Sequence, residues 1–566
     1  MISRSDAIAS LRDNEFDVVV IGGGITGAGV ALDAASRGYS VALVERDDYA
    51  QGTSSRSSKM VHGGLRYLQN FDVGLVREAL LERQLMVQLA PHLVYPTPFL
   101  VPNLGEERRS RSLGVGLNMY DAMATTRIGK GRDQVKLREQ DNYWHPDRHR
   151  TISGKEAAEM IPALVSRDPA GAYLFYDCQT DDVRLTLTIL GEAERFGAVL
   201  LNGAEVAEVI DEDGRAAGVL AIEAESGEEL RVRAINVVNA TGVWADRIRP
   251  EEILNEEEVP RISPSRGTHI TLSFEDLPIG EAACILPAGE DRTIFALPWY
   301  GRTLAGTTDN DYEGDIDAVP AGSDDINYLL TALNEYFGLS LGPGELTGAY
   351  AGVRPLISSG DPKKSVDISR KAELYETSSG MLTITGGKLT TWRRMAKQVV
   401  DRMVEREGRE APCRTAEIPL GMEASDDDLQ SKIELPDGAT AQLAFRYGHA
   451  ARSVLAITAE HPQLAAPIVE GHPDLSSEVL IAARAEQARS VADVLLRRTR
   501  LGLLAAAGLR DGTVAARVAA LLGEELGWSP ERISEEAAAW AGVSVREGLD
   551  PAVQMNGPTA PPGSII

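Results

Sequence analysis

Three glycines near the N-terminus have the spacing of a phosphate-binding turn. Gly22, Gly24 and Gly27 follow the mostly apolar run 16–21 and open a segment with a helical pattern. The first glycine permits a tight turn, the second lets backbone N–H groups approach a pyrophosphate, and the third lets the helix pack on the sheet. Glu45 ends the next apolar run, where a carboxylate binds ribose hydroxyls and disfavours a 2′-phosphate. Together these residues predict a dinucleotide-binding site.

Two further segments bear on which dinucleotide binds, because NAD and FAD both use this turn. The segment 52–59, GTSSRSSK, gathers small hydroxyl groups that can line an extended ligand with hydroxyl and backbone donors. The segment 238–242, VNATG, is a second crossing from a strand into a turn. Either segment alone is equally well a plain loop, but the two together favour FAD.

The elements that must hold these residues alternate between strands and helices. The first strand–turn–helix–strand unit spans about 30 residues and predicts a parallel sheet. The alternation returns at 185–201, and the acidic segment 206–231 has the Asp-Gly and Ser-Gly pairs typical of a β-meander. Antiparallel strands are expected within 260–310 and a helix at 324–337. Ala/Leu/Arg/Glu-rich stretches with helical periodicity predict a helical C-terminal domain, at 476–506, 511–526 and 529–542.

The composition bounds the class of protein. The chain has 566 residues, enough for about three or four domains, and its hydrophobic content of 43% excludes a disordered chain. Its 57 Lys and Arg against 84 Asp and Glu give a net charge of −27, which argues against a nucleic-acid or anionic-lipid surface. Only 10 of the basic residues are Lys. This composition favours a protein that works in concentrated salt, although an ordinary acidic cytosolic protein also fits.

The cysteines and the apolar stretches support neither a metal site nor a membrane span. Cys178, Cys284 and Cys413 lie far apart without a CxxC, so no metal is expected and the thiols are predicted to be reduced, in a cytoplasmic protein. The longest mostly apolar stretch, 18–32, is shorter than the ~20 residues that a bilayer requires. The N-terminus lacks the apolar core of a signal peptide.

Five longer segments are specific enough to indicate a family. They are GTSSRSSKMVHGGLRYL (52–68), VVNATGVWAD (237–246), LAGTTD (304–309), AGVRPL (351–356) and TGGKLTTWRRMA (385–396). In this order and spacing they closely resemble the FAD-dependent glycerol-3-phosphate dehydrogenases, in the wider D-amino-acid-oxidase-like group of flavoproteins. The resemblance covers about residues 14–545. With the acidic composition, it indicates a catalytic subunit from a salt-loving archaeon.

The resemblance implies an α/β fold of three domains. These are a Rossmann-like FAD-binding domain assembled from discontinuous segments, a mixed-sheet substrate (cap) domain, and an α-helical C-terminal domain followed by a disordered Pro/Gly tail. The predicted limits, in that order, are 1–100, 170–250 and 350–410 for the FAD-binding domain; 101–169 and 251–349 for the cap domain; 411–548 for the helical domain; and 549–566 for the tail.

The reaction implied by the resemblance is the oxidation of sn-glycerol 3-phosphate to dihydroxyacetone phosphate. A hydride would pass from C2 to flavin N5, and the electrons would pass to a quinone pool, directly or through a membrane-anchored partner subunit. The protein would then be cytoplasmic and peripheral on the inner face of the cell membrane. Two alternatives stay open: a glycerol-3-phosphate oxidase that uses O₂, and a non-catalytic FAD-binding sensor.

Cations on or beside glycine-rich turns suit a phosphate dianion, because Arg supplies bidentate donors. By resemblance, Arg66, Arg354, Arg370 and Lys388 match the substrate-site positions, with Tyr67 beside them. Taken singly, each of these cations is more readily a solvated or salt-bridged surface residue. The sequence around Arg370 departs most from the family.

Oxidation of an alcohol by hydride loss also requires a base for the hydroxyl proton. His62, in MVHGG, has an unperturbed pKa near ~6.5 that suits this task, and its two glycines and nearby Arg66 favour a catalytic role. Arg354 can share the role by stabilising the developing alkoxide. His269, in RGTHITL, has a family counterpart but is explained equally well by strand burial.

The remaining cofactor contacts come from the same segments. Lys388 precedes a helix expected to begin near Leu389, and both could stabilise the anionic reduced flavin at its N1–C2=O edge. The basic cluster Arg497, Arg498 and Arg500 is interpreted as a salt-bridged helix face. The residues expected to bind the FAD are Gly22, Gly24, Ile25, Thr26, Gly27, Glu45, Arg46, Thr53, Ser54, Ser55, Ser58, Lys59, Val206, Ala240, Thr241, Gly242, Trp244, Gly387, Lys388, Leu389 and Thr390.

Overall fold

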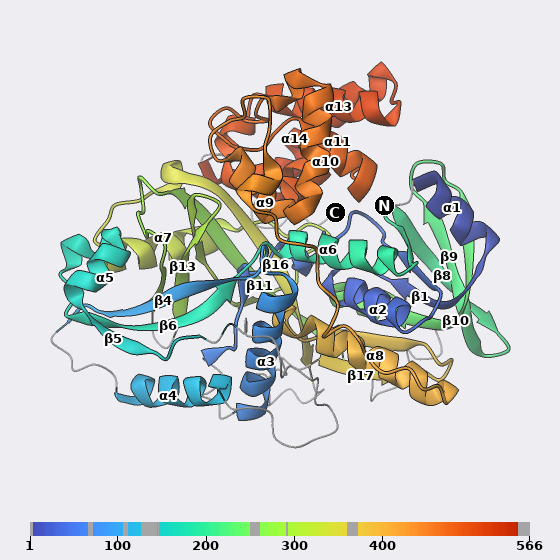
Figure 1. Cartoon of the computed structure of the whole chain (residues 1–566), viewed down its shortest axis with the longest axis horizontal. Coiled ribbons are helices and arrows are strands. Elements are labelled where there is room, and N and C mark those ends of the chain that lie inside the picture. The colour runs from blue at the N-terminus through green and yellow to red at the C-terminus, as the bar shows by residue number, and fades with distance from the viewer. Residues whose placement is uncertain are drawn as a thin grey trace.

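The molecule has three parts: two β-sheets with their helices, side by side, and a helical part above the junction between them (Figure 1). The computed structural model describes residues 4–65, 72–105, 111–125, 144, 146–248, 261–289, 292–358 and 372–552. Of the predicted substrate residues, Arg66, Tyr67 and Arg370 lie outside the described residues.

The first sheet confirms the predicted parallel unit. Its strands are β1 (Glu15–Ile21), β2 (Val41–Val44), β7 (Val199–Leu201), β8 (Ala204–Glu212), β9 (Arg215–Glu223), β10 (Glu229–Asn239), β17 (Ala372–Glu376) and β18 (Leu382–Gly386). Along the main path the order is β17-β18-β10-β1-β2-β7, and all neighbours are parallel except β17 and β18. The predicted acidic meander is also present, as the antiparallel strands β8, β9 and β10.

Helices cover one face of this sheet and fix its parallel strands. They are α2 (Ile25–Ser36), α6 (Asp182–Arg195) and α8 (Trp392–Glu407), and α2 contacts both of the others. Gly29 permits a close approach, since a Cβ there would lie 2.6 Å from the Trp392 ring. Val18, Val20 and Leu43 of the strands are fully buried in the same core. This core holds the carboxyl ends of β1, β2 and β10 at one edge of the sheet.

The second sheet has ten strands and is mostly antiparallel, which confirms the prediction for 260–310. Its strands are β3 (Met60–Val61), β4 (Tyr95–Asn103), β5 (Arg150–Ser153), β6 (Gly171–Gln179), β11 (Arg261–Ser273), β12 (Ala283–Pro287), β13 (Thr293–Trp299), β14 (Arg302–Gly306), β15 (Asn310–Asp311) and β16 (Leu346–Ser358). The longest pairing joins β11 to β16. Strands β3, β4, β6 and β16 come from ranges expected to belong to the FAD-binding domain; the domain limits stay a prediction.

The helices beside the second sheet include the one predicted at 324–337. These helices are α3 (Val73–Leu89), α4 (Arg111–Thr125), α5 (Gly154–Met160) and α7 (Ser323–Phe337). Helix α7 packs Ile326, Leu329 and Leu333 against the sheet, and all three side chains are fully buried. Because α7 is fixed in this way, the turn that precedes it is held beside the first sheet, where it contacts Trp244.

The third part is helical, as predicted from the periodicity after residue 412. Its helices are α9 (Ala439–Tyr447), α10 (Ala451–Glu460), α11 (Ser477–Glu486), α12 (Leu501–Leu504), α13 (Thr513–Leu526) and α14 (Pro530–Glu547). The stretch 476–506 is divided, however: α11 ends at Glu486, a short π-helix η12 (Asp493–Arg498) follows, and Arg500 has a left-handed φ of 68°.

The basic cluster at this break is salt-bridged, as interpreted from the sequence, but its side chains are buried and do not lie on the face of a regular α-helix. Arg497 and Arg498 both pair with Asp48 of the first part, and their side chains are 6% and 0% exposed. Arg498 also pairs with Glu486. Helical periodicity is lost here because the arginines turn inward to carboxylates that are distant in the sequence.

The first residues of the predicted tail are also ordered. The carbonyl oxygen of Leu549 accepts a hydrogen bond from Ala349 N–H at 3.0 Å, and the side chain of Leu549 is 2% exposed. Asp550 pairs with Arg510. The first contact joins the end of the helical part to β16, and the second joins two segments of the helical part. Residues 553–566 lie outside the described residues.

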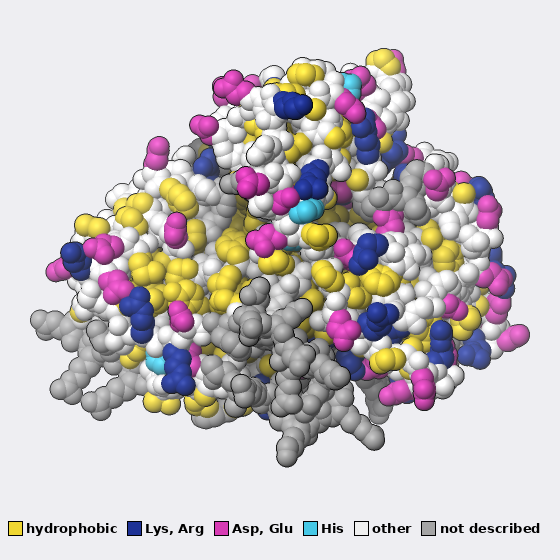
Figure 2. All heavy atoms as spheres, in the orientation of Figure 1, with side chains coloured by type: hydrophobic (Ala, Val, Ile, Leu, Met, Phe, Trp, Pro, Cys, Tyr) yellow, Lys and Arg dark blue, Asp and Glu magenta, His cyan; other side chains and the backbone are white. Residues whose placement is uncertain are grey.

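Acidic and basic side chains are dispersed over all three parts on the face shown in Figure 2. Within the described residues, no helix combines the length and the apolarity that a membrane crossing needs. The same residues hold no cluster of three or more metal-ligating side chains. Cys178 and Cys284 are buried thiols, and Cys413 is half-buried.

Candidate active site

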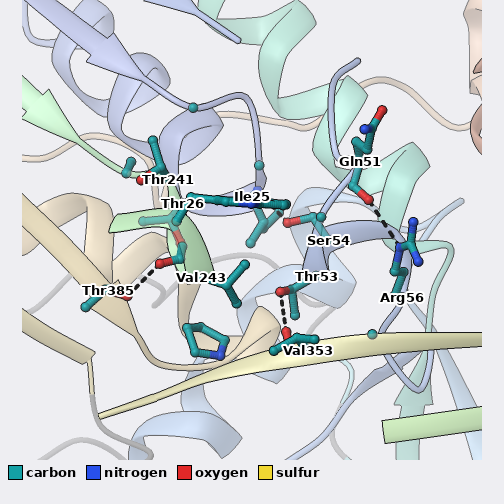
Figure 3. Close-up of a pocket in the computed structure, with 18 of the residues that line it drawn as sticks. Ile25, Thr26, Gln51, Thr53, Ser54, Arg56, Thr241, Val243, Val353 and Thr385 are labelled. Atoms are coloured by element: carbon teal, nitrogen blue, oxygen red, sulfur yellow. Dashed lines mark hydrogen bonds between the residues drawn. The ribbon is translucent and has the colours of Figure 1, made fainter. Parts of the chain in front are cut away.

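A cavity of about 390 Å³ lies where the two sheets meet. The carboxyl ends of β1, β2, β10 and β18 form one side of it, and β11 and β16 form the other. The close-up in Figure 3 shows residues of the turn after β1, the segment 51–56 and β16 facing one another. Ligands of parallel α/β sheets bind at this edge, because the strand ends and helix N-termini meet there.

The glycine turn has the roles predicted from its spacing. Gly22 has a φ of +106°, and a Cβ there would lie 2.8 Å from the carbonyl oxygen of Ala240. A Cβ at Gly27 would lie 1.9 Å from the carbonyl oxygen of Gly22, so only glycine lets α2 pack this closely. Gly24 lies at the N-terminus of α2 and lines the cavity. The helix end therefore faces the cavity, as a pyrophosphate site requires.

Glu45 follows β2 and lines the cavity. Its carboxylate accepts hydrogen bonds from Gly23 N–H at 2.6 Å and Asp47 N–H at 3.0 Å. Burial, with smaller contributions from the charges of Asp47 and Asp48, raises the pKa of Glu45 to about 7. A half-buried carboxylate with spare acceptor capacity suits the hydroxyl donors of a ribose.

The hydroxyl-rich segment 52–59 forms one wall of the cavity. Thr53 Oγ1 donates to Val353 O at 2.6 Å, and Ser54 Oγ accepts from Ile25 N–H at 2.9 Å (Figure 3). These bonds join the wall to β16 and to the N-terminus of α2. All predicted cofactor residues line the cavity except Gly27, Ser55 and Lys59. Ser55 Oγ donates to the carbonyl oxygens of Gln51 and Gly52 at 3.2 Å, and Lys59 directs its Nζ to Asp182 on α6.

The opposite end of the cavity brings together the predicted catalytic groups. His62 follows β3, Arg354 lies in β16, and Lys388 precedes the short turn that leads into α8; all three line the cavity. Thr390 Oγ1 accepts from His62 N–H at 3.2 Å, which joins the first and last of these segments. The Nζ atom of Lys388 is buried.

Arg354 has a fixed orientation. Its Nη2 donates to Thr307 Oγ1 at 3.0 Å and to Thr308 O at 3.1 Å, and its Nη1 contacts Asp309 Oδ1 at 3.1 Å. These three partners belong to the LAGTTD segment, for which the sequence alone predicted no role. The guanidinium is thus held in place while its side chain stays 28% exposed to the cavity side.

His269 is both a buried strand residue and part of the cavity wall. It lies in β11 with 3% exposure, and its Nε2 is 2.9 Å from Ser58 Oγ. Its ring stacks on Tyr350 with centroids 4.8 Å apart. Burial and the charges of Lys59 and Arg354 lower the pKa of His269 well below its usual value, so the ring is neutral. The two interpretations of His269, a buried strand residue and a residue of the site, therefore both apply.

The residues of the cavity fit an FAD. Gly22 and Gly24 of the glycine turn line the cavity, and Gly52 leaves room beside Trp244, since a Cβ there would lie 2.7 Å from the indole ring. The guanidinium of Arg46 packs over the Trp244 ring, with its Cζ atom 5.3 Å from the ring centroid. Two facing sheets with a glycine turn at their common edge are typical of flavin-dependent oxidoreductases.

Comparison with known proteins gives the family. The family of FAD-dependent oxidoreductases matches residues 17–393, and a family described as the C-terminal domain of alpha-glycerophosphate oxidase matches residues 413–533. The chain belongs to the FAD-dependent oxidoreductases, and its cofactor is FAD. The expected α/β fold class with a helical C-terminal domain is confirmed.

Its relatives include proteins named for one activity. The chain is 37% identical over 544 residues to glycerol-3-phosphate dehydrogenase 2 of Mycobacterium tuberculosis, covering 94% of this chain and 89% of the relative. It is 34% identical over 572 residues to a mitochondrial glycerol-3-phosphate dehydrogenase of Arabidopsis thaliana, covering 94% and 86%. The X-ray structure of the glycerol-3-phosphate dehydrogenase from Bacillus halodurans with FAD superposes with a TM-score of 0.76 at 29% identity, over 97% of this chain and 99% of that one.

Proposed function

We propose that this protein oxidises sn-glycerol 3-phosphate to dihydroxyacetone phosphate. The activity in the names of its relatives supports the proposal, as do the residues of this chain. One observation carries it: His62, Arg354 and Lys388, from segments far apart in the sequence, line the same cavity as the glycine turn. A base and two cations beside a dinucleotide site are the groups that oxidation of a phosphorylated alcohol needs.

Bound FAD supplies the acceptor for the hydride that leaves C2, at flavin N5. The chain supplies the rest of the chemistry. His62 accepts the proton of the C2 hydroxyl through its imidazole nitrogen. Arg354 stabilises the oxygen that gains negative charge, and because Thr307, Thr308 and Asp309 hold its guanidinium, little reorganisation is needed as the charge develops.

The phosphate of the substrate requires cations inside the cavity. We assign this role to Lys388, whose Nζ is buried in the cavity wall, together with Arg354 and the predicted contacts Arg66, Tyr67 and Arg370. Burial strengthens the attraction between an ammonium group and a dianion, because water screens it less. Free glycerol lacks the dianion and is therefore expected to be a poor substrate.

An anaerobic titration of the FAD-loaded protein tests the proposal. Glycerol 3-phosphate is expected to bleach the flavin band, whereas glycerol and NADH are not. The variant His62→Ala should bind FAD as the wild type does and be reduced slowly. Loss of FAD from this variant would mean that His62 is structural. Failure of glycerol 3-phosphate to bleach the wild-type flavin would favour the sensor instead.

A glycerol-3-phosphate oxidase is the second candidate, because the matched C-terminal family is described as a domain of alpha-glycerophosphate oxidase. We favour the dehydrogenase, with a quinone as electron acceptor either directly or through a membrane-anchored partner subunit. Rapid substrate-dependent formation of peroxide by the purified protein, without added quinone or dye, would contradict this choice.

The place of work follows from the acceptor. We propose that the protein acts in the cytoplasm, on the inner face of the cell membrane and attached through a partner. A halophilic archaeal origin would account for the net charge of −27. Co-sedimentation with membranes that contain the partner, and its absence with protein-free vesicles, would support this attachment; binding to the bare vesicles would contradict it.

A further inference from the structure

A buried cluster of two cations and two carboxylates lies behind residues 55–59 of the wall segment 52–59. Lys59 Nζ is 2.8 Å from Asp182 Oδ2, and Arg500 Nη2 is 2.6 Å from Asp182 Oδ1. Arg500 Nε is 3.4 Å from Asp181 Oδ2. All four side chains are at most 1% exposed. Three parts of the chain therefore meet at one carboxylate: the wall, the start of α6 and the C-terminal helical part.

The cluster joins two basic and two acidic side chains, and burial together with the charge of Arg500 lowers the pKa of Lys59 to about 7, although its pairing with Asp182 opposes this shift. Removing one partner of a buried ion pair leaves the other without compensation, so each of the four depends on the rest. Aromatic rings close the cluster: Lys59 Nζ lies 4.7 Å from the Tyr350 ring centroid, and Arg500 lies 5.4 Å from that of Trp299. The ion pairs and the rings thus hold the four buried side chains in place.

The backbone is strained to bring the two cations together. Lys59 has a φ of 58° and Arg500 a φ of 68°, both in the left-handed region that favours glycine. A residue other than glycine keeps this backbone conformation only when contacts with the surrounding structure enforce it. The two side chains that meet at Asp182 are therefore held by the cluster against a local preference for other conformations.

The cluster also holds the backbone of the wall. Asp182 Oδ2 accepts hydrogen bonds from Ser57 N–H at 3.0 Å and Ser57 Oγ at 2.7 Å. The carbonyl oxygen of Ser55 accepts from Lys59 Nζ at 2.6 Å and from Arg500 Nη2 at 3.3 Å. The carbonyl oxygen of Ser57 accepts from Tyr350 at 2.8 Å. Asp182 and Arg500 thereby fix the turn from both sides.

This turn leads directly to residues of the active-site cavity. Ser57 and Ser58 line the cavity, and Ser58 Oγ contacts His269 Nε2, which also lines it. His269 in turn stacks on Tyr350, which holds Ser57. A shift of the turn would therefore move Ser58 and His269 together, on the side of the cavity that Arg354 shares.

We propose that Arg500 is a positioning residue of the active site, through which the C-terminal helical part sets the geometry of the wall at Ser57 and Ser58. Among the described residues that line the cavity, none comes from beyond Met395. The helical part thus acts on the cavity through the cluster and not by direct contact. This inference rests on the proposed function only for the substrate used to test it.

The variant Arg500→Met keeps the length of the side chain but removes its charge and its hydrogen bonds. With FAD bound, it is expected to show an altered visible flavin spectrum, a rate of anaerobic flavin reduction by glycerol 3-phosphate lower by about tenfold or more, and a higher KM. Arg500→Lys restores the charge without the forked donors and should recover part of the rate.

Arg37→Met is the matched control. Arg37 is an equally buried arginine, 1% exposed, that pairs with Asp33 at 2.5 Å and Asp401 at 2.7 Å on α2 and α8, and no contact joins it to segment 55–59. It is expected to lower Tm as Arg500→Met does, but to leave the flavin spectrum, the reduction rate and KM unchanged. Similar kinetic losses in both variants would overturn the proposal.

Ser57→Ala keeps the test decisive if Arg500→Met does not fold. It removes the hydrogen bond from Ser57 Oγ to Asp182 and the one that Ser57 Oγ accepts from Lys59 N–H, and it keeps all four ionisable side chains of the cluster. It should reproduce the spectral change and the loss of rate in weaker form. Wild-type spectrum and rates in Ser57→Ala and Arg500→Lys would overturn the proposal. Reduction of the wild type by glycerol 3-phosphate reports on the proposed function separately, whatever the variants do.

Discussion

Arg354 shows how a single side chain is prepared for its role. Two hydrogen bonds from Nη2 and one ion pair from Nη1 fix the plane of the guanidinium within β16. In the proposed reaction this guanidinium stabilises the oxygen that becomes negative. A group that is oriented in advance stabilises that charge without reorganisation, which is the larger part of its benefit.

Arg354→Lys keeps the positive charge but loses the fork that Thr307, Thr308 and Asp309 hold. We expect flavin reduction by glycerol 3-phosphate to slow by on the order of 10²-fold, with FAD still bound, in rapid-mixing measurements without oxygen. Arg233→Lys, an exposed arginine paired with Glu212, is the matched control and should behave as the wild type. Equal rates for Arg354→Lys and the control would exclude an oriented guanidinium from the reaction.

Glu45 gives a prediction for pH. Its pKa in the folded protein is about 7, above the ordinary 4.5, so between these values the FAD-free folded state binds an extra proton. The free energy of unfolding must then fall as the pH rises through this window, by about 3 kcal/mol in all.

Calorimetry of the FAD-free protein between about pH 5 and 8 checks this sign. Tm of Glu45→Gln should depend less on pH than Tm of the wild type, because the variant lacks the titrating carboxyl. Glu335→Gln, at an exposed position of α7, should keep the wild-type dependence. A wild-type dependence that Glu45→Gln preserves would contradict the assignment to Glu45.

At the scale of elements, the turn between β15 and α7 is joined to the cofactor edge of the first sheet. Asp317 in this turn accepts from Trp244 Nε1 at 2.7 Å and pairs with Arg247 at 2.7 Å and Arg46 at 2.9 Å. These contacts hold the pKa of Asp317 below its ordinary value, although burial opposes them. The three partners of Asp317 all line the cavity, so the turn supports its rim.

Asp317→Asn should therefore speed the dissociation of FAD. Because Asp317 is partly exposed, each ion pair contributes little, and we expect an increase of about three- to tenfold at low salt that shrinks as salt is added. Flavin fluorescence released after dilution measures the rate. Asp324→Asn, an exposed change at the start of α7, should leave the rate of FAD dissociation unaltered. The same increase in both variants would contradict the claim that the contacts of Asp317 at the rim slow this dissociation.

What the sequence predicts well at this scale is local. The unit from β1 to β2 follows from two apolar runs and a glycine turn, and almost every predicted cofactor residue lines the cavity because the motifs fix the strand ends. Lys59 is predicted to contact the FAD but does not line the cavity, because its left-handed backbone turns the side chain behind the wall. Periodicity also missed the break before Arg500, because the carboxylates that cause it are distant in the sequence.

At the scale of the molecule, the arginines serve in two ways. Some neutralise carboxylates in the interior, as Arg497 and Arg498 do at Asp48, where they hold the pKa of Asp48 near 2 despite its burial. Others, such as Arg354, line the cavity. The net charge of −27 is left to the surface, where acidic groups repel one another.

Salt should stabilise this protein. Molar KCl or NaCl screens the surface repulsion but reaches the buried pairs far less, so Tm and the rate of glycerol 3-phosphate oxidation are both expected to rise. Calorimetry and steady-state assays over a series of salt concentrations measure the two effects. A fall of Tm and activity in concentrated salt would contradict adaptation to salt as the reason for the acidic surface.

The transfer of the C2 hydrogen to the flavin is the most direct point at which to test the proposed reaction. Rapid mixing of the FAD-loaded protein with glycerol 3-phosphate, without oxygen, should bleach the flavin, and substrate carrying deuterium at C2 should bleach it more slowly. His62→Ala should slow both reactions and keep its FAD. A flavin that stays oxidised with both the unlabelled and the deuterated substrate would contradict the proposed function. Equal rates of bleaching for the two substrates would contradict hydride loss from C2 as the slow step.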